Sequence, residues 1–277
     1  MTAKPFPSVY KIAFLGSGRM ATALARGFVK SGQVLPQQIS TADTSPASLQ
    51  SFSAQLPGCA LYESGRSLPD DVDLLVLAVK PQFAAVAVPP LKAVISKAKV
   101  LSVMAGIRLQ KLEQWLDTDQ LIRCMPNTPS LVNAGAIGMA AHPSVRAGDL
   151  ELIESLLQSV GQVTRTTEPQ LDAVTGLSGS GPAYVFSFIR ALITGGVRAG
   201  LSPQAAQELA LQTVYGAVEL LRQSQQTPEE LIAQVSSPGG TTLRGLEVLA
   251  AGDFERTVAD CVVAAAKRAE ELGSADA

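Results

Sequence analysis

Short apolar runs alternate with helix-like segments along the first part of the chain. Uninterrupted apolar stretches of this kind are typical of parallel strands that are covered on both faces. The segments between them place apolar residues at helical spacing. We therefore predict a sheet of about eight strands, at residues 11–15, 39–42, 60–62, 73–79, 100–103, 121–125, 136–140 and 162–165, with helices at 46–56, 82–97 and 148–159 among the connections.

The alternation of strand and helix stops near residue 168. Beyond that point the pattern predicts helices only, with Pro182, Pro203 and Pro228 each in a first helical turn. The predicted fold is α/β: a Rossmann-type, doubly wound, mostly parallel sheet followed by an all-helical dimerisation domain. The predicted domains are 1–167 for dinucleotide binding and 168–277 for substrate binding and dimerisation. Helices this apolar on several sides predict a homodimer or a higher oligomer of dimers.

The first predicted strand runs into a glycine-rich turn that opens a helix. Gly16 can adopt the backbone angles of a sharp turn, and Gly18 has no side chain to keep a pyrophosphate away from the main chain. Ala21 lets the helix lie close to the strand. The free amides at the helix start would bind an anion, so the turn predicts a dinucleotide site.

The end of the second predicted strand is where such a fold examines the adenosine ribose. Asp43 there would accept hydrogen bonds from ribose hydroxyls and repel a 2′-phosphate, which favours NAD. Thr44 and Ser45 offer hydroxyls that would instead hold the phosphate of NADP. A simple turn that caps the next helix is a third interpretation.

Polar residues follow two further predicted strands at the same edge of the sheet. Lys80 precedes Pro81, which ends the strand, and either meets the cofactor or is solvated. Asn127 and Thr128 lie between two prolines and present short polar groups at another strand end. Either a contact with the ligand or a structural turn would explain these two residues.

A second glycine-rich loop lies in the helical part of the chain. It comprises Ser236, Ser237, Pro238, Gly239, Gly240, Thr241 and Thr242. Its amides are free and its hydroxyls lead into the next helix, so the segment suits a bound carboxylate. A helix-breaking linker is the alternative.

Composition excludes several classes of function. The formal charge of −2 gives no electrostatic footprint for nucleic acid, which leaves a small-molecule substrate as the simpler partner. Three scattered cysteines indicate reduced core thiols, and the single histidine, His142, makes a metal site of the usual kind improbable. No signal peptide or membrane segment is visible, so we expect a cytoplasmic location with no membrane partner.

These residues favour hydride transfer with the cofactor carrying the chemistry. Reduction of a ketone calls for a strong proton donor beside the oxygen. Reduction of a C=N bond needs less, because an iminium is already electrophilic. The scarcity of histidine thus favours an imine over a ketone, although Lys80 keeps ketone chemistry open.

Taken together, the motifs resemble pyrroline-5-carboxylate reductase over essentially the whole chain. The matching segments are Phe14–Met20, Ala78–Gln82, Arg123–Pro129, Ala173–Tyr184 and Val235–Thr242. The last two of these segments are highly specific for the family.

The resemblance implies an enzyme that reduces 1-pyrroline-5-carboxylate to L-proline with NADPH, NADH being possible, in the last step of proline biosynthesis. Thr242 would lie nearest the ring nitrogen and Lys80 near the reacting centre. Asp43 departs from the small or hydroxyl-bearing residues often found at its position. The implied cofactor residues are Gly16, Ser17, Gly18, Arg19, Met20, Asp43, Thr44, Ser45, Ala78, Val79, Lys80, Pro81 and Asn127, and the implied substrate residues are Met125, Thr128 and Ser236–Thr242.

Two other functions share this plan. A hydroxyacid or 6-phosphogluconate-type dehydrogenase would carry a lysine on the first long helix of the second domain, and the segment Pro182–Ala199 has none. A nucleotide-sensing dimer without turnover would not need the loop Ser236–Thr242 as a second anion site.

Overall fold

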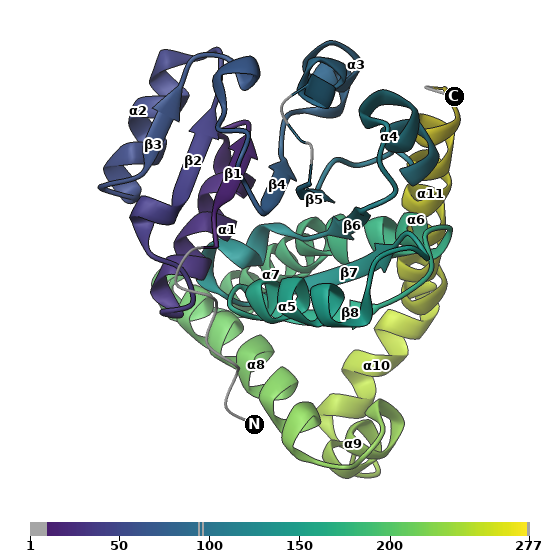
Figure 1. The fold of residues 1–277 in the computed structure, drawn as a ribbon. Helices are drawn as coiled ribbons and strands as arrows, with labels where there is room; N and C mark the ends of the chain where they lie inside the picture. The colour runs from purple at the N-terminus through teal and green to yellow at the C-terminus, as the bar shows by residue number, and fades with distance from the viewer. Residues whose placement is uncertain (1–9, 94, 96, 276–277) are drawn as a thin grey trace. The chain divides into compact units, whose positions relative to one another are not determined.

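The structure is a computed structural model that describes residues 10–93, 95 and 97–275 (Figure 1). Contacts divide the described chain into two compact units. Residues up to Ser180 and from Val263 onward form the first, and Gly181–Val262 form the second. These units follow packing, whereas the predicted domains 1–167 and 168–277 follow chain order, and that boundary stays a prediction.

The first unit contains the predicted eight-stranded sheet (Figure 1). Its order is β3-β2-β1-β4-β5-β6-β7-β8, and every neighbouring pair is parallel except β6 with β7. After β1, the chain adds β2 and β3 on one side of β1 and then β4 on the other side. Open α/β sheets bind ligands at such a point, where the strand order reverses. The strands are β1 (Ile12–Leu15), β2 (Ile39–Ala42), β3 (Ala60–Tyr62), β4 (Leu74–Leu77), β5 (Lys99–Ser102), β6 (Leu121–Met125), β7 (Gly135–Ala141) and β8 (Gly161–Arg165).

Each face of this sheet has its own hydrophobic core. Along β1, Ile12 and Phe14 belong to one buried cluster, and Ala13 and Leu15 belong to the other. All four residues of β4 are buried as well. This alternation confirms that the apolar runs are strands covered on both sides.

The helices of the first unit largely match the predicted segments. They are α1 (Arg19–Lys30), α2 (Pro46–Gln55), α3 (Ala84–Ala87), α4 (Leu109–Leu116), α5 (Ala147–Gln158) and α6 (Gln170–Val174). The single helix predicted over 82–97 was wrong, because α3 stops and a 3-10 segment, Pro89–Ala93, follows it. Two successive prolines, Pro89 and Pro90, supply no backbone N–H groups to continue an α-helix.

The second unit is helical, as predicted. It holds α7 (Gly181–Arg198), α8 (Pro203–Gln223), α9 (Pro228–Val235), α10 (Thr241–Ala251) and the start of α11 (Phe254–Ala275). A Cβ on Gly196 would lie 3.2 Å from the Cβ of Ala206, so α7 and α8 pack closely there. Among the described helices, none is both long and apolar enough to cross a membrane.

Large apolar side chains are exposed on the second unit. Phe186 is 64% exposed on α7, Tyr215 is 62% exposed on α8, and Val248 is 72% exposed on α10. The buried apolar residues of α7 to α10 are only two alanines, Ala206 and Ala210. Helices with so much uncovered apolar surface require a partner surface.

Candidate cofactor and substrate site

The glycine turn lies at the carboxyl end of β1. Gly16 has φ +99° and donates a hydrogen bond from its N–H to the carbonyl of Ala42, at 2.7 Å. A Cβ on Gly16 would lie 2.8 Å from the carbonyl oxygen of Ala78. The backbone angle requires glycine, as the sequence predicts, and the close approach to Ala78 requires it as well.

Gly18 is different, because nothing lies within 4 Å of a Cβ built on it. It is exposed and stands immediately before α1 as the N-cap residue. The space beside it is open for a ligand to approach the amides that begin the helix. Together with the helix dipole, this arrangement fits a pyrophosphate.

Asp43 is fixed by the glycine turn. Its Oδ2 accepts hydrogen bonds from the N–H and the hydroxyl of Ser17, at 2.9 and 3.0 Å. Its Oδ1 accepts a hydrogen bond from the N–H of Ser45, at 2.9 Å. The carboxylate thus joins the end of β2 to the turn after β1, across 26 positions of the sequence.

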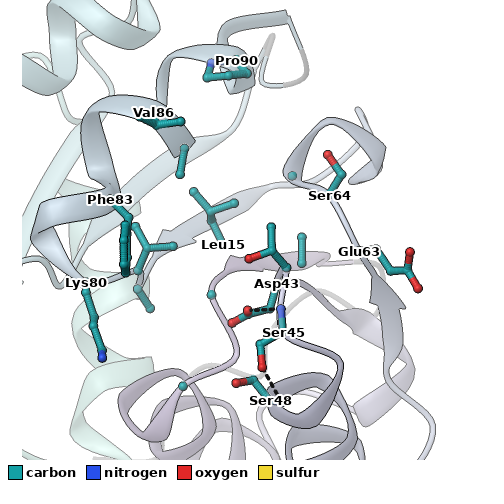
Figure 2. A pocket seen from close by; sticks show the side chains of 18 of the residues that line it. Leu15, Asp43, Ser45, Ser48, Glu63, Ser64, Lys80, Phe83, Val86 and Pro90 are labelled. Atoms are coloured by element: carbon teal, nitrogen blue, oxygen red, sulfur yellow. Dashed lines mark hydrogen bonds between the residues drawn. The ribbon is translucent and has the colours of Figure 1, made fainter.

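A cleft of about 590 Å³ opens at the carboxyl ends of β1 to β4. Figure 2 shows Asp43 and Ser45 on one side of it and Lys80 and Phe83 on the other. The volume suits a small-molecule ligand. Eight of the predicted residues line it: Gly16, Gly18, Asp43, Thr44, Ser45, Ala78, Val79 and Lys80.

Several lining residues were not predicted. Ser48 lies in the first turn of α2, and Glu63, Ser64, Gly65 and Arg66 follow β3. Phe83, Val86, Ala87 and Pro90 come from the segment after β4. The available signal was their position just after strands, since ligands bind outside the carboxyl ends of strands in such sheets.

Four other predicted cofactor residues are not among those that line the cleft. Ser17 is buried beside Asp43, Arg19 and Met20 are the first residues of α1, and Pro81 begins a 3-10 turn. Their predicted cofactor contacts stay predictions.

Both polar atoms of the Asn127 side-chain amide form hydrogen bonds within the protein. Its Nδ2 donates to the carbonyl of Ser178 at 3.0 Å, and its Oδ1 accepts from the N–H of Ala136 at 2.9 Å. The residue is 8% exposed, and Thr128 begins the next 3-10 turn. The Cε of Met125 would lie 3.1 Å from a Cβ on Gly179. These residues hold the end of β6 against the segment that follows α6.

The predicted carboxylate loop lies in the second unit. It connects α9 to α10, and Gly239 has φ +72°. The N–H of Gly240 donates to the carbonyl of Ser237 at 2.9 Å, and the Ser236 hydroxyl is buried with no partner among the described residues. Thr241 and Thr242 form the first turn of α10, so both hydroxyls stand at a helix N-terminus. The loop fits an anion.

Histidine and cysteine side chains are few in this chain. Burial raises the pKa of the Cys124 thiol to about 12, so it is protonated at neutral pH. The Nδ1 of His142 accepts a hydrogen bond from the N–H of Ser144, in the turn after β7. No group of three His, Cys, Asp or Glu side chains in the described residues is placed to hold a metal.

Fold and site define an oxidoreductase that uses a nicotinamide dinucleotide. The family described as pyrroline-5-carboxylate reductase dimerisation matches residues 168–272, and the family described as NADP oxidoreductase, coenzyme F420-dependent, matches residues 11–106. The chain is 41% identical to pyrroline-5-carboxylate reductase of Arabidopsis thaliana, covering 98% of this chain and 99% of the relative. The chain belongs to the pyrroline-5-carboxylate reductase family.

Solved structures agree with this membership. The Plasmodium falciparum pyrroline carboxylate reductase with NADP bound has a TM-score of 0.87 and 31% identity, covering 96% of this chain and 99% of that one. The Coxiella burnetii pyrroline-5-carboxylate reductase also has a TM-score of 0.87, with 34% identity, covering 95% and 98%. The predicted fold class, family and NAD(P)H-dependent reductase function are confirmed.

Proposed function

We propose that this chain reduces 1-pyrroline-5-carboxylate to L-proline by binding the dinucleotide at the Gly16–Gly18 turn and the substrate carboxylate at the Ser236–Thr242 loop. The observation that carries the proposal is the glycine turn itself. The backbone of Gly16 and the open space beside Gly18 leave the first amides of α1 free for a pyrophosphate.

When bound, the reduced nicotinamide supplies the hydride for the C=N bond. The residues after β4, Ala78 to Pro81, would line the nicotinamide end of the cleft, because β4 lies beside β1 on the side away from β2. Lys80 would place its positive charge beside the reacting groups. Met125, Asn127 and Thr128 would complete this end.

The loop between α9 and α10 would orient the ring. The backbone N–H groups of Thr241 and Thr242 at the N-terminus of α10 would hold the carboxylate, and the Thr242 hydroxyl would face the ring nitrogen. The buried, unpartnered hydroxyl of Ser236 is a further group that a bound substrate would satisfy.

We also propose that the enzyme works as a homodimer or a larger homo-oligomer in the cytoplasm. The uncovered apolar side chains of α7, α8 and α10 support self-association, and the three cysteines are unpaired, as expected in a reducing compartment. Light scattering after size-exclusion chromatography tests the first point, and a monomeric mass at micromolar concentration would refute it.

The activity is tested by following NADPH oxidation when 1-pyrroline-5-carboxylate is added, with L-proline identified as the product. Thr242→Ala is expected to lower kcat by about ten- to hundredfold while the KM for NADPH stays within about twofold. Thr257→Ala is the control, because Thr257 is an exposed threonine near the start of another helix, α11. Absence of L-proline formation by the unmodified enzyme would refute the function. Unchanged kinetics in Thr242→Ala would remove this residue from the site.

A further inference from the structure

Asp43 lies after β2, at the end of the cleft where the adenosine ribose is expected, and its carboxylate already accepts hydrogen bonds from the protein. Asp43 receives three hydrogen bonds from Ser17 and Ser45, which fix its carboxylate against the protein. In Figure 2 the carboxylate of Asp43 is turned toward the backbone nitrogen of Ser45. These three donors offset its negative charge within the protein. Asp43 therefore acts first as a brace for the glycine turn.

A cation lies at the same end of the cleft. Arg66 follows β3 in the short turn Gly65–Ser67, and the Ser64 hydroxyl accepts a hydrogen bond from the N–H of Arg66 at 3.3 Å. A Cβ on Gly65 would lie 2.8 Å from the Cδ1 of Leu15, so this turn is pressed against the end of β1. The Arg66 side chain is exposed and has no hydrogen-bond or ion-pair partner among the described residues.

The strand order fixes which part of a dinucleotide this arginine serves. From β3 to β4, the cleft presents Arg66, then Asp43 and Ser45, then the glycine turn, then Lys80. The N–H of Asp43 donates to the carbonyl of Tyr62 at 3.1 Å, so the segments after β2 and β3 leave the sheet side by side. The two cations that line the cleft thus lie on opposite sides of the pyrophosphate turn.

Two hydroxyls lie between Arg66 and the glycine turn. The Ser45 hydroxyl accepts a hydrogen bond from the N–H of Ser48 at 3.3 Å, which leaves its own proton free to donate. Ser48 also lines the cleft, in the first turn of α2. Glu63 is the other acid in the lining, and Figure 2 shows its carboxylate turned away from Asp43 and Ser45.

We propose that Arg66, assisted by the Ser45 and Ser48 hydroxyls, binds the 2′-phosphate on the adenosine ribose and makes this enzyme prefer NADPH over NADH. A guanidinium binds a phosphate by two parallel hydrogen bonds, and an arginine near the end of the second strand is a recurrent way to accept this group. The inference rests on the proposed dinucleotide site. It assigns cofactor choice to the turn after β3, instead of to Asp43.

The test measures binding separately from turnover. Titration calorimetry with adenosine 2′,5′-bisphosphate and with 5′-AMP reports the contribution of the 2′-phosphate without substrate. Arg66→Gln is expected to lower the affinity for the bisphosphate by about ten- to hundredfold relative to the affinity for 5′-AMP. Arg66→Lys is expected to lower it by less, because lysine keeps the positive charge but cannot form the two parallel hydrogen bonds of a guanidinium. Arg26→Gln is the matched control, because Arg26 is also an exposed arginine of the first unit but lies outside this cleft.

The kinetic readout is the ratio of kcat/KM with NADPH to that with NADH. This ratio is expected to fall by about ten- to hundredfold in Arg66→Gln and to be kept in Arg26→Gln. A ratio within about twofold of the unmodified enzyme, together with unchanged bisphosphate binding, would overturn the assignment. Failure of the unmodified enzyme to form L-proline would overturn the proposed function, while the calorimetry would still decide the role of Arg66.

Discussion

Replacing each glycine of the nucleotide turn by alanine separates folding from ligand binding. In Gly16→Ala the new Cβ would lie 2.8 Å from the carbonyl oxygen and 2.9 Å from the carbonyl carbon of Ala78, closer than packed atoms approach. The residue would also have to keep φ near +99°. A left-handed backbone costs a residue with a side chain about 1–2 kcal/mol, and overpacking adds about 1–3 kcal/mol.

We therefore expect Gly16→Ala to lose about 2–5 kcal/mol of unfolding free energy, which corresponds to a Tm lower by about 5–15 °C. Gly18→Ala is the matched control. Its Cβ meets nothing within 4 Å and its φ of −71° suits alanine, so only the weaker helix cap costs stability, by less than about 1 kcal/mol.

Cofactor binding should show the reverse order. Per molecule of folded protein, Gly18→Ala should bind NADPH more weakly than Gly16→Ala does. Gly18→Ala places a methyl group beside the amides that would hold the pyrophosphate, so its KM for NADPH should rise by about tenfold or more with little loss of Tm. Thermal unfolding and NADPH titration measure the two effects. If Gly16→Ala melted like the unmodified protein, the close contact with Ala78 would be refuted. If Gly18→Ala bound NADPH normally, the turn would not hold the pyrophosphate.

Three further predictions concern single side chains. Asp43→Asn should lower the unfolding free energy by about 1–3 kcal/mol, since an amide cannot accept all three hydrogen bonds; unchanged urea denaturation would show that the brace contributes nothing. Burial raises the pKa of Cys124 to about 12, so iodoacetamide should alkylate it at least about a hundredfold more slowly in native than in denatured protein; equal rates would contradict its burial. Burial raises the pKa of Asp149, but hydrogen bonds from Arg146 and Lys99 outweigh it and hold the pKa below its usual range. The stability that Asp149 adds is therefore present at neutral pH and lost as pH falls below about 4, so the destabilisation by Asp149→Asn should shrink in acid; a destabilisation independent of pH would refute this.

The local pattern of the sequence determined most of the secondary structure. The strands Ile39–Ala42, Ala60–Tyr62 and Leu121–Met125 begin and end as predicted, because turn residues bound each of these short segments. Thr227 and Glu230 form a capping box at the start of α9, which depends only on residues close together in the sequence. The glycine turn was predictable because the backbone demands of Gly16 and the need for space at Gly18 are local properties.

Only the tertiary structure decided which strand ends share a cleft. Asp43 and Ser17 meet because β2 pairs with β1, and the turn that carries Arg66 joins them because β3 pairs with β2. Strand order depends on how the whole sheet buries its two cores, so no local pattern encodes it. For the same reason the sequence did not show that Asp43 accepts two hydrogen bonds from Ser17, which lies 26 positions away.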